Sequence, residues 1–129
     1  MLLRAFHLKG NNMTFSLLKL PKSKNWYDAP LACPRCGEGN LHHDDVQVFV
    51  RDSEDGPHAV TYVTQDGAST SRSPAGDTRN PSARRDGLRI FFTCESCNSP
   101  DDGDHAPRRR LPPLAIVQHK GLTYIYWEQ

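Results

Sequence analysis

The residues best suited to chemistry are four cysteines, which fall into two Cys-x-x-Cys pairs, CPRC at residues 33–36 and CESC at residues 94–97. Two residues between the thiolates let the backbone curl, so that both sulfurs reach one metal ion at about 2.3 Å. Two such pairs supply the four ligands of a tetrahedral zinc site that leaves no position open for water. The sequence therefore predicts one structural Zn²⁺. Its predicted ligands are Cys33, Cys36, Cys94 and Cys97.

The residues that follow the two pairs, Gly37 and Asn98, tolerate the left-handed backbone that turns N–H groups toward sulfur. Paired disulfides are an alternative, but Arg4 and His7 interrupt the N-terminus before an apolar run of signal-peptide length can form. A redox motif would need a helix after one pair, and neither GEGN nor NSPDDGD predicts one. These patterns favour a metal site over disulfide or redox chemistry.

Length and composition predict one small domain. The chain has 129 residues, of which 36% are hydrophobic, and its 16 Lys and Arg against 15 Asp and Glu give a net charge of +1. The modest apolar content suggests that metal binding contributes much of the stability. No segment is long and apolar enough to span a membrane, so we expect a soluble, cytoplasmic protein with reduced thiols and no membrane contact.

Alternating apolar residues predict five strands and almost no helix. Three strands are expected over residues 46–51, 58–64 and 88–94, and two more around a turn in residues 114–127. Residues 66–87 contain no hydrophobic residue larger than alanine, which predicts a long exposed Arg-rich loop. Residues 1–30 are interpreted as an N-terminal arm and residues 31–129 as a four-cysteine β domain.

Clusters of arginine are the strongest candidates for a binding surface, because guanidinium groups fit phosphates in a bidentate manner. Acidic residues lie close by in sequence, so neutralisation within the molecule is an alternative. Tyr124 and Tyr126 share one face of the last strand, as core residues or interface anchors, and Trp127 takes the other. The predicted partner-binding residues are Arg72, Arg79, Arg84, Arg85, Arg108, Arg109, Arg110 and Trp127.

The string His42-His43-Asp44-Asp45 is the most enzyme-like segment, because imidazoles and carboxylates bind catalytic metals. With a Cys-x-x-Cys pair on each side and Asn80 in between, it resembles parts of the His-Asn-His nucleases. Those enzymes continue the second pair into a helix with a further His, whereas this chain continues with NSPDDGDHAPRRRLPP. On a regular strand His42 and Asp44 would also point away from His43 and Asp45. A solvated strand or a second, non-catalytic metal site are the alternatives.

Two other enzyme classes find no support. A zinc deaminase needs an HxE motif before the first cysteine pair, and the sequence has none there. A serine hydrolase would need a nucleophile motif such as GxSxG, which is also absent from the sequence. No small-molecule substrate is expected.

The CPRCG and CESCN knuckles, set among predicted β-hairpins, resemble the zinc-ribbon superfamily over about residues 31–128. This resemblance implies a small mainly-β zinc ribbon with antiparallel hairpins, two zinc knuckles and long polar loops, used as a binding module. The strings LHHDDVQVF, NPSARRDGL, FFTCESC and IVQHKG resemble small zinc-ribbon proteins of actinobacteria, their phages and mobile elements. That narrower resemblance implies an accessory protein that binds a host component.

The sequence thus favours a non-enzymatic zinc-binding module whose Arg-rich loop engages a macromolecular partner, with nucleic acid preferred. The alternative is a phage or mobile-element accessory protein that modulates a host protein complex. A nuclease of the His-Asn-His type is the third hypothesis.

Overall fold

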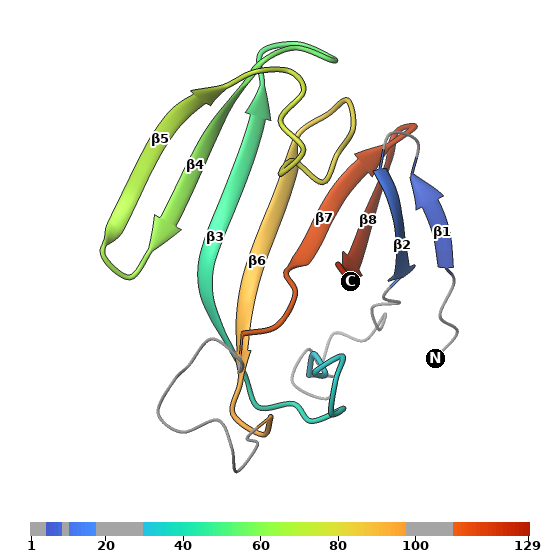
Figure 1. The fold of residues 1–129 in the computed structure, drawn as a ribbon, viewed down its shortest axis with the longest axis vertical. Helices are drawn as coiled ribbons and strands as arrows, with labels where there is room; N and C mark the ends of the chain where they lie inside the picture. Colours follow the sequence, from blue (N-terminus) through green and yellow to red (C-terminus); the bar gives the residue numbers. More distant parts are fainter. Residues whose placement is uncertain (1–4, 9–10, 18–29, 98–109) are drawn as a thin grey trace.

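One antiparallel β-sheet of eight strands makes up the fold (Figure 1). The computed structural model describes residues 5–8, 11–17, 30–97 and 110–129, and these contain no helix. The spatial order of the strands is β1-β2-β8-β7-β6-β3-β4-β5. The strands are β1 (Ala5–Leu8), β2 (Asn11–Leu17), β3 (Leu41–Arg51), β4 (His58–Thr64), β5 (Gly67–Ser73), β6 (Gly87–Cys94), β7 (Leu114–His119) and β8 (Leu122–Trp127). The expected small mainly-β fold is confirmed.

All five predicted strands are present, as β3, β4, β6, β7 and β8. The turn between β7 and β8 places Lys120 at φ 49° and Gly121 at φ 77°. Positive φ at both central residues is the two-residue hairpin geometry that matches the twist of paired strands. The local sequence pattern therefore predicted the β7–β8 hairpin correctly.

The expectation of a loop over residues 66–87 is wrong for its first part, because Gly67–Ser73 forms the edge strand β5. This strand pairs with β4 along its whole length, and the hydroxyls of Thr61 and Thr70 are hydrogen-bonded across the pair at 2.9 Å. An edge strand gains its main-chain hydrogen bonds from one neighbour and needs no apolar side chains of its own. Composition alone could not reveal it.

The second part, residues 74–86, is a loop that packs onto the sheet. Asn80, Pro81 and Ser82 are buried in it, against the expectation of full exposure. The guanidinium of Arg51 donates five hydrogen bonds of 2.8–3.2 Å to main-chain carbonyls around this loop. The accepting carbonyls belong to Gly56, Ala75, Ser82, Ala83 and Arg85. One side chain thereby organises a loop that has no large apolar residue.

The N-terminal arm contributes two strands to the sheet. β1 and β2 form a hairpin, and β2 pairs with β8 through Ser16 opposite Trp127 and Leu17 opposite Tyr126. The rest of the arm, residues 18–29, lies outside the described residues.

The two faces of the sheet are covered at opposite ends of the strands (Figure 1). Directly paired residues share a face, so Val46, Ile90, Leu114 and Trp127 define one face, here called the knuckle face. Residues 30–40 cover its lower end in the view. The opposite face, the loop face, carries Phe49, Val60 and Val117 beneath residues 74–86.

Candidate metal centre

The first cysteine pair sits in a tight turn that precedes β3. The Cys33 N–H donates to the Glu38 carbonyl at 2.8 Å, and the Gly37 N–H donates to the Cys33 carbonyl at 2.9 Å. Gly37 has φ 80°, as its residue type predicts. The Arg35 N–H lies 3.4 Å from the Cys33 sulfur and points at it, which is the knuckle arrangement expected for a thiolate.

The second pair begins at Cys94, the last residue of β6. Leu41 at the start of β3 pairs with Cys94, so the β3–β6 register brings the two knuckles together. The turn after β6 is hydrogen-bonded to the segment between the first cysteine pair and β3, because the Glu95 N–H donates to the Asn40 carbonyl at 3.1 Å. The Asn40 amide also donates to the Ser96 hydroxyl at 3.1 Å. Strand pairing thus brings together two cysteine pairs whose members are 58 to 64 residues apart in sequence.

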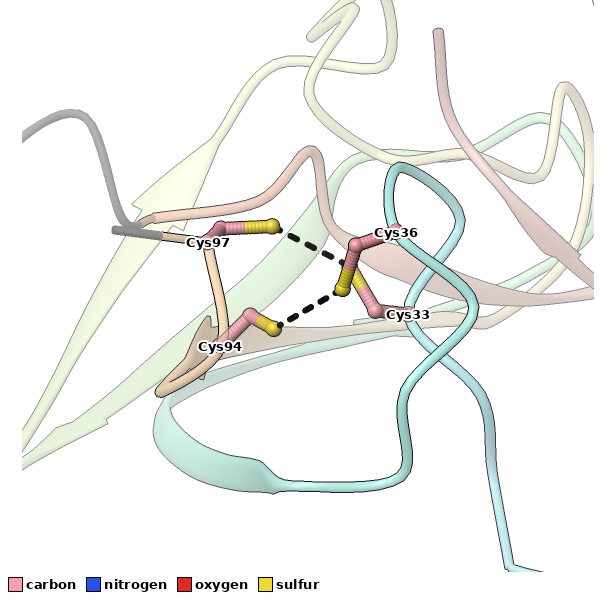
Figure 2. Close-up of side chains that lie close together, drawn as sticks. All are labelled: Cys33, Cys36, Cys94 and Cys97. Atoms are coloured by element: carbon pink, nitrogen blue, oxygen red, sulfur yellow. Dashed lines mark hydrogen bonds between the residues drawn. The ribbon is translucent and has the colours of Figure 1, made fainter. Parts of the chain in front are cut away.

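The four sulfurs form a compact cluster (Figure 2). They all lie within 4.8 Å of one another, and the Cys33–Cys97 and Cys36–Cys94 sulfur pairs are each 3.6 Å apart. A tetrahedral ion with metal–sulfur bonds of 2.3 Å places its ligands about 3.8 Å apart. Disulfide-bonded sulfurs would be about 2.05 Å apart. The cluster therefore has the dimensions of a four-thiolate metal site, and the cysteines are free thiols.

Ionisation of the cluster favours a bound cation. Burial raises the pKa of the Cys33 thiol, but the Cys36 and Arg35 N–H groups and two neighbouring thiols more than offset this and lower it to about 7. Burial, and then its hydrogen bonds to the other thiols, raises the pKa of Cys97. One thiolate forms readily and a second resists forming beside it. A divalent cation at the centre would remove that resistance.

An apolar cluster surrounds the metal-binding sulfurs. Cys33 and Cys94 are buried together with Leu111, Leu114 and Trp127. The Trp127 ring packs edge-on against Phe92 with centroids 5.5 Å apart. Trp127 is only 7% exposed, so its predicted role at a partner surface conflicts with its position. On the loop face Tyr126 is also buried, in agreement with the core alternative for that residue.

The His42–Asp45 segment lies on β3 beside the four cysteines, and three of its side chains have partners of their own. The His42 Nε2 is 2.8 Å from a Glu95 carboxylate oxygen, and Asp44 accepts a hydrogen bond from the Thr93 hydroxyl. Asp45 accepts from the Tyr62 hydroxyl at 2.7 Å. Among the described residues, the four cysteines alone form a group of three or more side chains close enough to hold one ion.

A β-bulge corrects one expectation about this segment. Pairing passes from His43 opposite Phe92 to Val46 opposite Ile90, so two residues of β3 oppose Phe91. A bulge of this kind breaks the alternation of side chains. Asp45 therefore turns to the loop face, where it contacts Tyr62, and it shares that face with Asp44 instead of with His43.

The four arginines predicted from residues 66–87 as binding residues all have acidic neighbours. Arg72 pairs with Asp52, and Arg79 pairs with Asp77 at 2.7 Å. A second set joins the loop to the β3–β4 turn: Arg84 to Glu54 and to Asp55, both at 2.8 Å, and Arg85 to Glu54 at 3.2 Å. The neutralisation considered from the sequence is therefore what these four residues show.

The third arginine cluster is only partly described, because Arg108 and Arg109 lie outside the described residues. Arg110 pairs with Asp45 at 2.9 Å, and its guanidinium lies 4.2 Å from the Phe91 ring centroid.

The sequence analysis missed one surface, an apolar face of the sheet. Val46, Val48 and Val50 alternate toward the knuckle face, and the same pattern that predicted the strand indicated an apolar face that needs a cover.

The described part of the chain is a β-sheet fold with four cysteines positioned to hold a metal ion. Comparison with protein-family models, with curated proteins and with solved structures gives no match for this chain. Within the described residues no helix is long and apolar enough to cross a membrane.

Proposed function

We propose that this chain is a non-enzymatic module, folded around one structural Zn²⁺ ion, that binds a protein partner. The observation that carries the proposal is the cluster of four free thiols with 3.6 Å sulfur separations. Zinc is the common ion of all-cysteine tetrahedral sites in reduced compartments. Four protein ligands leave no open position for substrate, which favours a structural role over catalysis. The resemblance to zinc ribbons agrees with a binding module.

The ion pairs favour a protein over a nucleic acid as the partner. Arg84 and Arg85 share Glu54, and Asp55 adds a further carboxylate, so phosphate would have to displace acids already in place. Affinity for nucleic acid comes largely from unpaired cationic charge and counterion release. A net charge of +1 supplies little of either. A mixed surface of this kind suits a protein interface, where paired charges fix orientation.

Native mass spectrometry of the whole metal-loaded chain tests the metal and nucleic acid parts. We expect one zinc per chain and no complex with short DNA or RNA duplexes at any salt concentration. Zinc in other stoichiometry would overturn the structural-site proposal. Duplex complexes that weaken steeply with salt would instead support the nucleic acid hypothesis.

A pair of variants sharpens the nucleic acid arm. Glu54→Ala removes a carboxylate that contacts both Arg84 and Arg85, so a nucleic acid binder should gain affinity. Arg84→Ala with Arg85→Ala should abolish that gain. If Glu54→Ala produces no duplex binding, the next experiment is affinity capture from cell extract to identify the protein partner. Zinc-loaded and chelated protein serve as the matched pair of baits.

The nuclease hypothesis has a separate test. Incubation of the zinc-loaded chain with plasmid and Mg²⁺ or Mn²⁺ should give no cleavage. Cleavage that His42→Ala and His43→Ala abolish would establish an enzyme and overturn the proposed function.

A further inference from the structure

The upper half of the knuckle face, beyond the end covered by residues 30–40, carries apolar side chains that the described residues leave partly open. Val50 is 49% exposed and Val63 is 40% exposed. Their neighbours on the same face are half-buried. The open apolar face consists of Val46, Val48, Val50, Val63, Leu88 and Ile90.

The centre of this face is uncharged. Cross-strand pairing aligns Val63, Val46 and Ile90 in one row. It aligns Thr61, Val48 and Leu88 in the next. Arg72 and Asp52 lie at the rim of this face and neutralise each other, and Asp86, just before β6, accepts a hydrogen bond from the Arg51 N–H. Such a surface offers a charged partner no complementary group, and it fits another uncharged, β-branched sheet face.

We propose that the open apolar face is a homodimer interface, on which the same face of a second copy packs as the second layer of a β-sandwich. Two copies carry the same twist and the same rows of small side chains, so their faces can stack about 10 Å apart in aligned fashion. A two-fold axis places each uncharged row against uncharged rows of the partner. The near-neutral net charge of +1 adds little repulsion between copies.

The size of the face predicts how strong this dimer is. Three neighbouring strands and three residue rows give a footprint of about 300 Å² per copy from standard sheet spacings. Stable complexes bury about 800 Å² per partner, and smaller interfaces are typical of weak association. We therefore expect a dimer that forms at high protein concentration and dissociates on dilution. This proposal stands independently of the zinc and partner assignments.

Sedimentation velocity on the whole zinc-loaded chain tests the proposal over about a hundredfold range of concentration. The wild type should shift from one chain toward two as concentration rises. Val50→Glu and Val63→Glu each place a carboxylate inside the face at an exposed position, so each variant should fold, bind zinc and remain monomeric. Two variants are used so that a folding defect in one leaves the other informative.

Leu122→Glu is the matched control. Leu122 is 58% exposed but pairs with His119 on the loop face, so the same substitution there should leave dimerisation unchanged. A wild type that stays monomeric throughout overturns the proposal, including the case in which the face binds only a different protein. A dimer that persists in both valine variants, as strand-edge pairing through β5 would give, overturns it as well.

Discussion

Two short covers with few large apolar residues close opposite ends of the sheet, and they are held by different means. Residues 30–40 cover the lower knuckle face, where the sulfurs of Cys33 and Cys94 sit among Leu111, Leu114 and Trp127. Residues 74–86 cover the upper loop face, where the Arg51 guanidinium binds five carbonyls. With the proposed zinc bound, the first cover depends on an ion from outside the polypeptide, whereas the second depends on the polypeptide alone.

The two covers show how a single sheet can be stabilised in a small protein with few apolar residues. A loop without large side chains cannot be fixed by apolar burial, so each cover is fixed at one polar centre that gathers several distant groups. The metal centre gathers four ligands from two segments, and Arg51 gathers carbonyls from the β3–β4 turn and the loop. The two ends should therefore respond separately to metal and to mutation.

Metal removal should have the largest effect and should act first at the knuckle end. Structural zinc contributes about 10–16 kcal/mol of apparent binding free energy, against a typical net domain stability of about 5–15 kcal/mol. We expect a chelator, or Cys94→Ser, to unfold the protein or leave only the β3–β5 end structured. Fluorescence of Trp127 in a Trp26→Phe background reports the knuckle end, and hydrogen exchange compares it with β4.

Readdition of zinc to the chelated wild type, but not to the Cys94→Ser variant, should restore the Trp127 signal. Unchanged thermal unfolding after complete chelation would show that the sulfur cluster does not hold the fold, and the contrast between the two covers would disappear.

Replacement of Arg51 by methionine should produce the second largest effect, at the other end. The change keeps an apolar stem and removes five donors, which leaves main-chain carbonyls of the loop unpaired. We expect a loss of about 2–4 kcal/mol in the free energy of unfolding, measured by chemical denaturation, with zinc content unchanged.

Two variants control for the loss of a charge. Arg51→Lys keeps the charge but has no planar fork, so it should recover only part of the stability. Arg72→Met removes an exposed guanidinium paired with Asp52 and should change the free energy of unfolding little, because solvent screens the pair. Equal losses from Arg51→Met and Arg72→Met would contradict the organising role of Arg51.

Gly87→Ala tests the close approach of the loop to β6 and should have a smaller effect. An added Cβ would lie 3.0 Å from Pro81 Cδ and would collide with the Asn80 side-chain oxygen. We expect a loss of about 1–3 kcal/mol, because the loop must shift to make room. Gly76→Ala in the same loop meets nothing within 4 Å and serves as the control. If both variants unfold at the same denaturant concentration, the loop does not pack as described.

The sequence predicted the two cysteine pairs as a candidate metal site, and five strands, because both depend on local spacing. The Cys-x-x-Cys pairs need only two intervening residues, and the valines from Val46 to Val50 alternate with the period of a strand. Gly37 likewise stands where its turn requires positive φ. Each of these signals is contained in a few consecutive residues.

The features that the sequence missed depend on residues far apart in the chain. β5 has no apolar residue larger than alanine and is a strand only because β4 offers it an edge. From the sequence, Arg51 cannot be distinguished from other surface charges. Its hydrogen bonds form only because the loop from residue 74 onward folds back over it. The bulge at Asp44 and Asp45 follows from the register between β3 and β6, which no local pattern specifies. Long-range pairing decides all three.

The smallest expected effect is a pH dependence at the covered loop face. His58 is fully buried there, and its Nε2 lies 4.0 Å from the Asp77 carboxylate, beyond hydrogen-bond distance. Burial lowers the pKa of His58, and the charges of Arg51 and Arg79 lower it further, while Asp77 opposes them. The folded state therefore binds fewer protons than the unfolded state, and stability should fall as pH drops below about 6.5.

The carboxylates of Asp52 and Asp77, near His58, do not account for a change in that range. The pKa values of Asp52 and Asp77 are lowered by Arg72 and Arg79, so their contribution is lost only below about pH 4. His58→Gln removes the titrating group and leaves the metal centre as it is. The difference in denaturant midpoint between wild type and this variant, followed from pH 7.5 to 5, isolates the imidazole, because thiolate protonation affects both proteins equally. Parallel curves for the two proteins would mean that His58 is protonated as easily in the folded chain as in the unfolded one, and that the cover over the loop face does not exclude water from it.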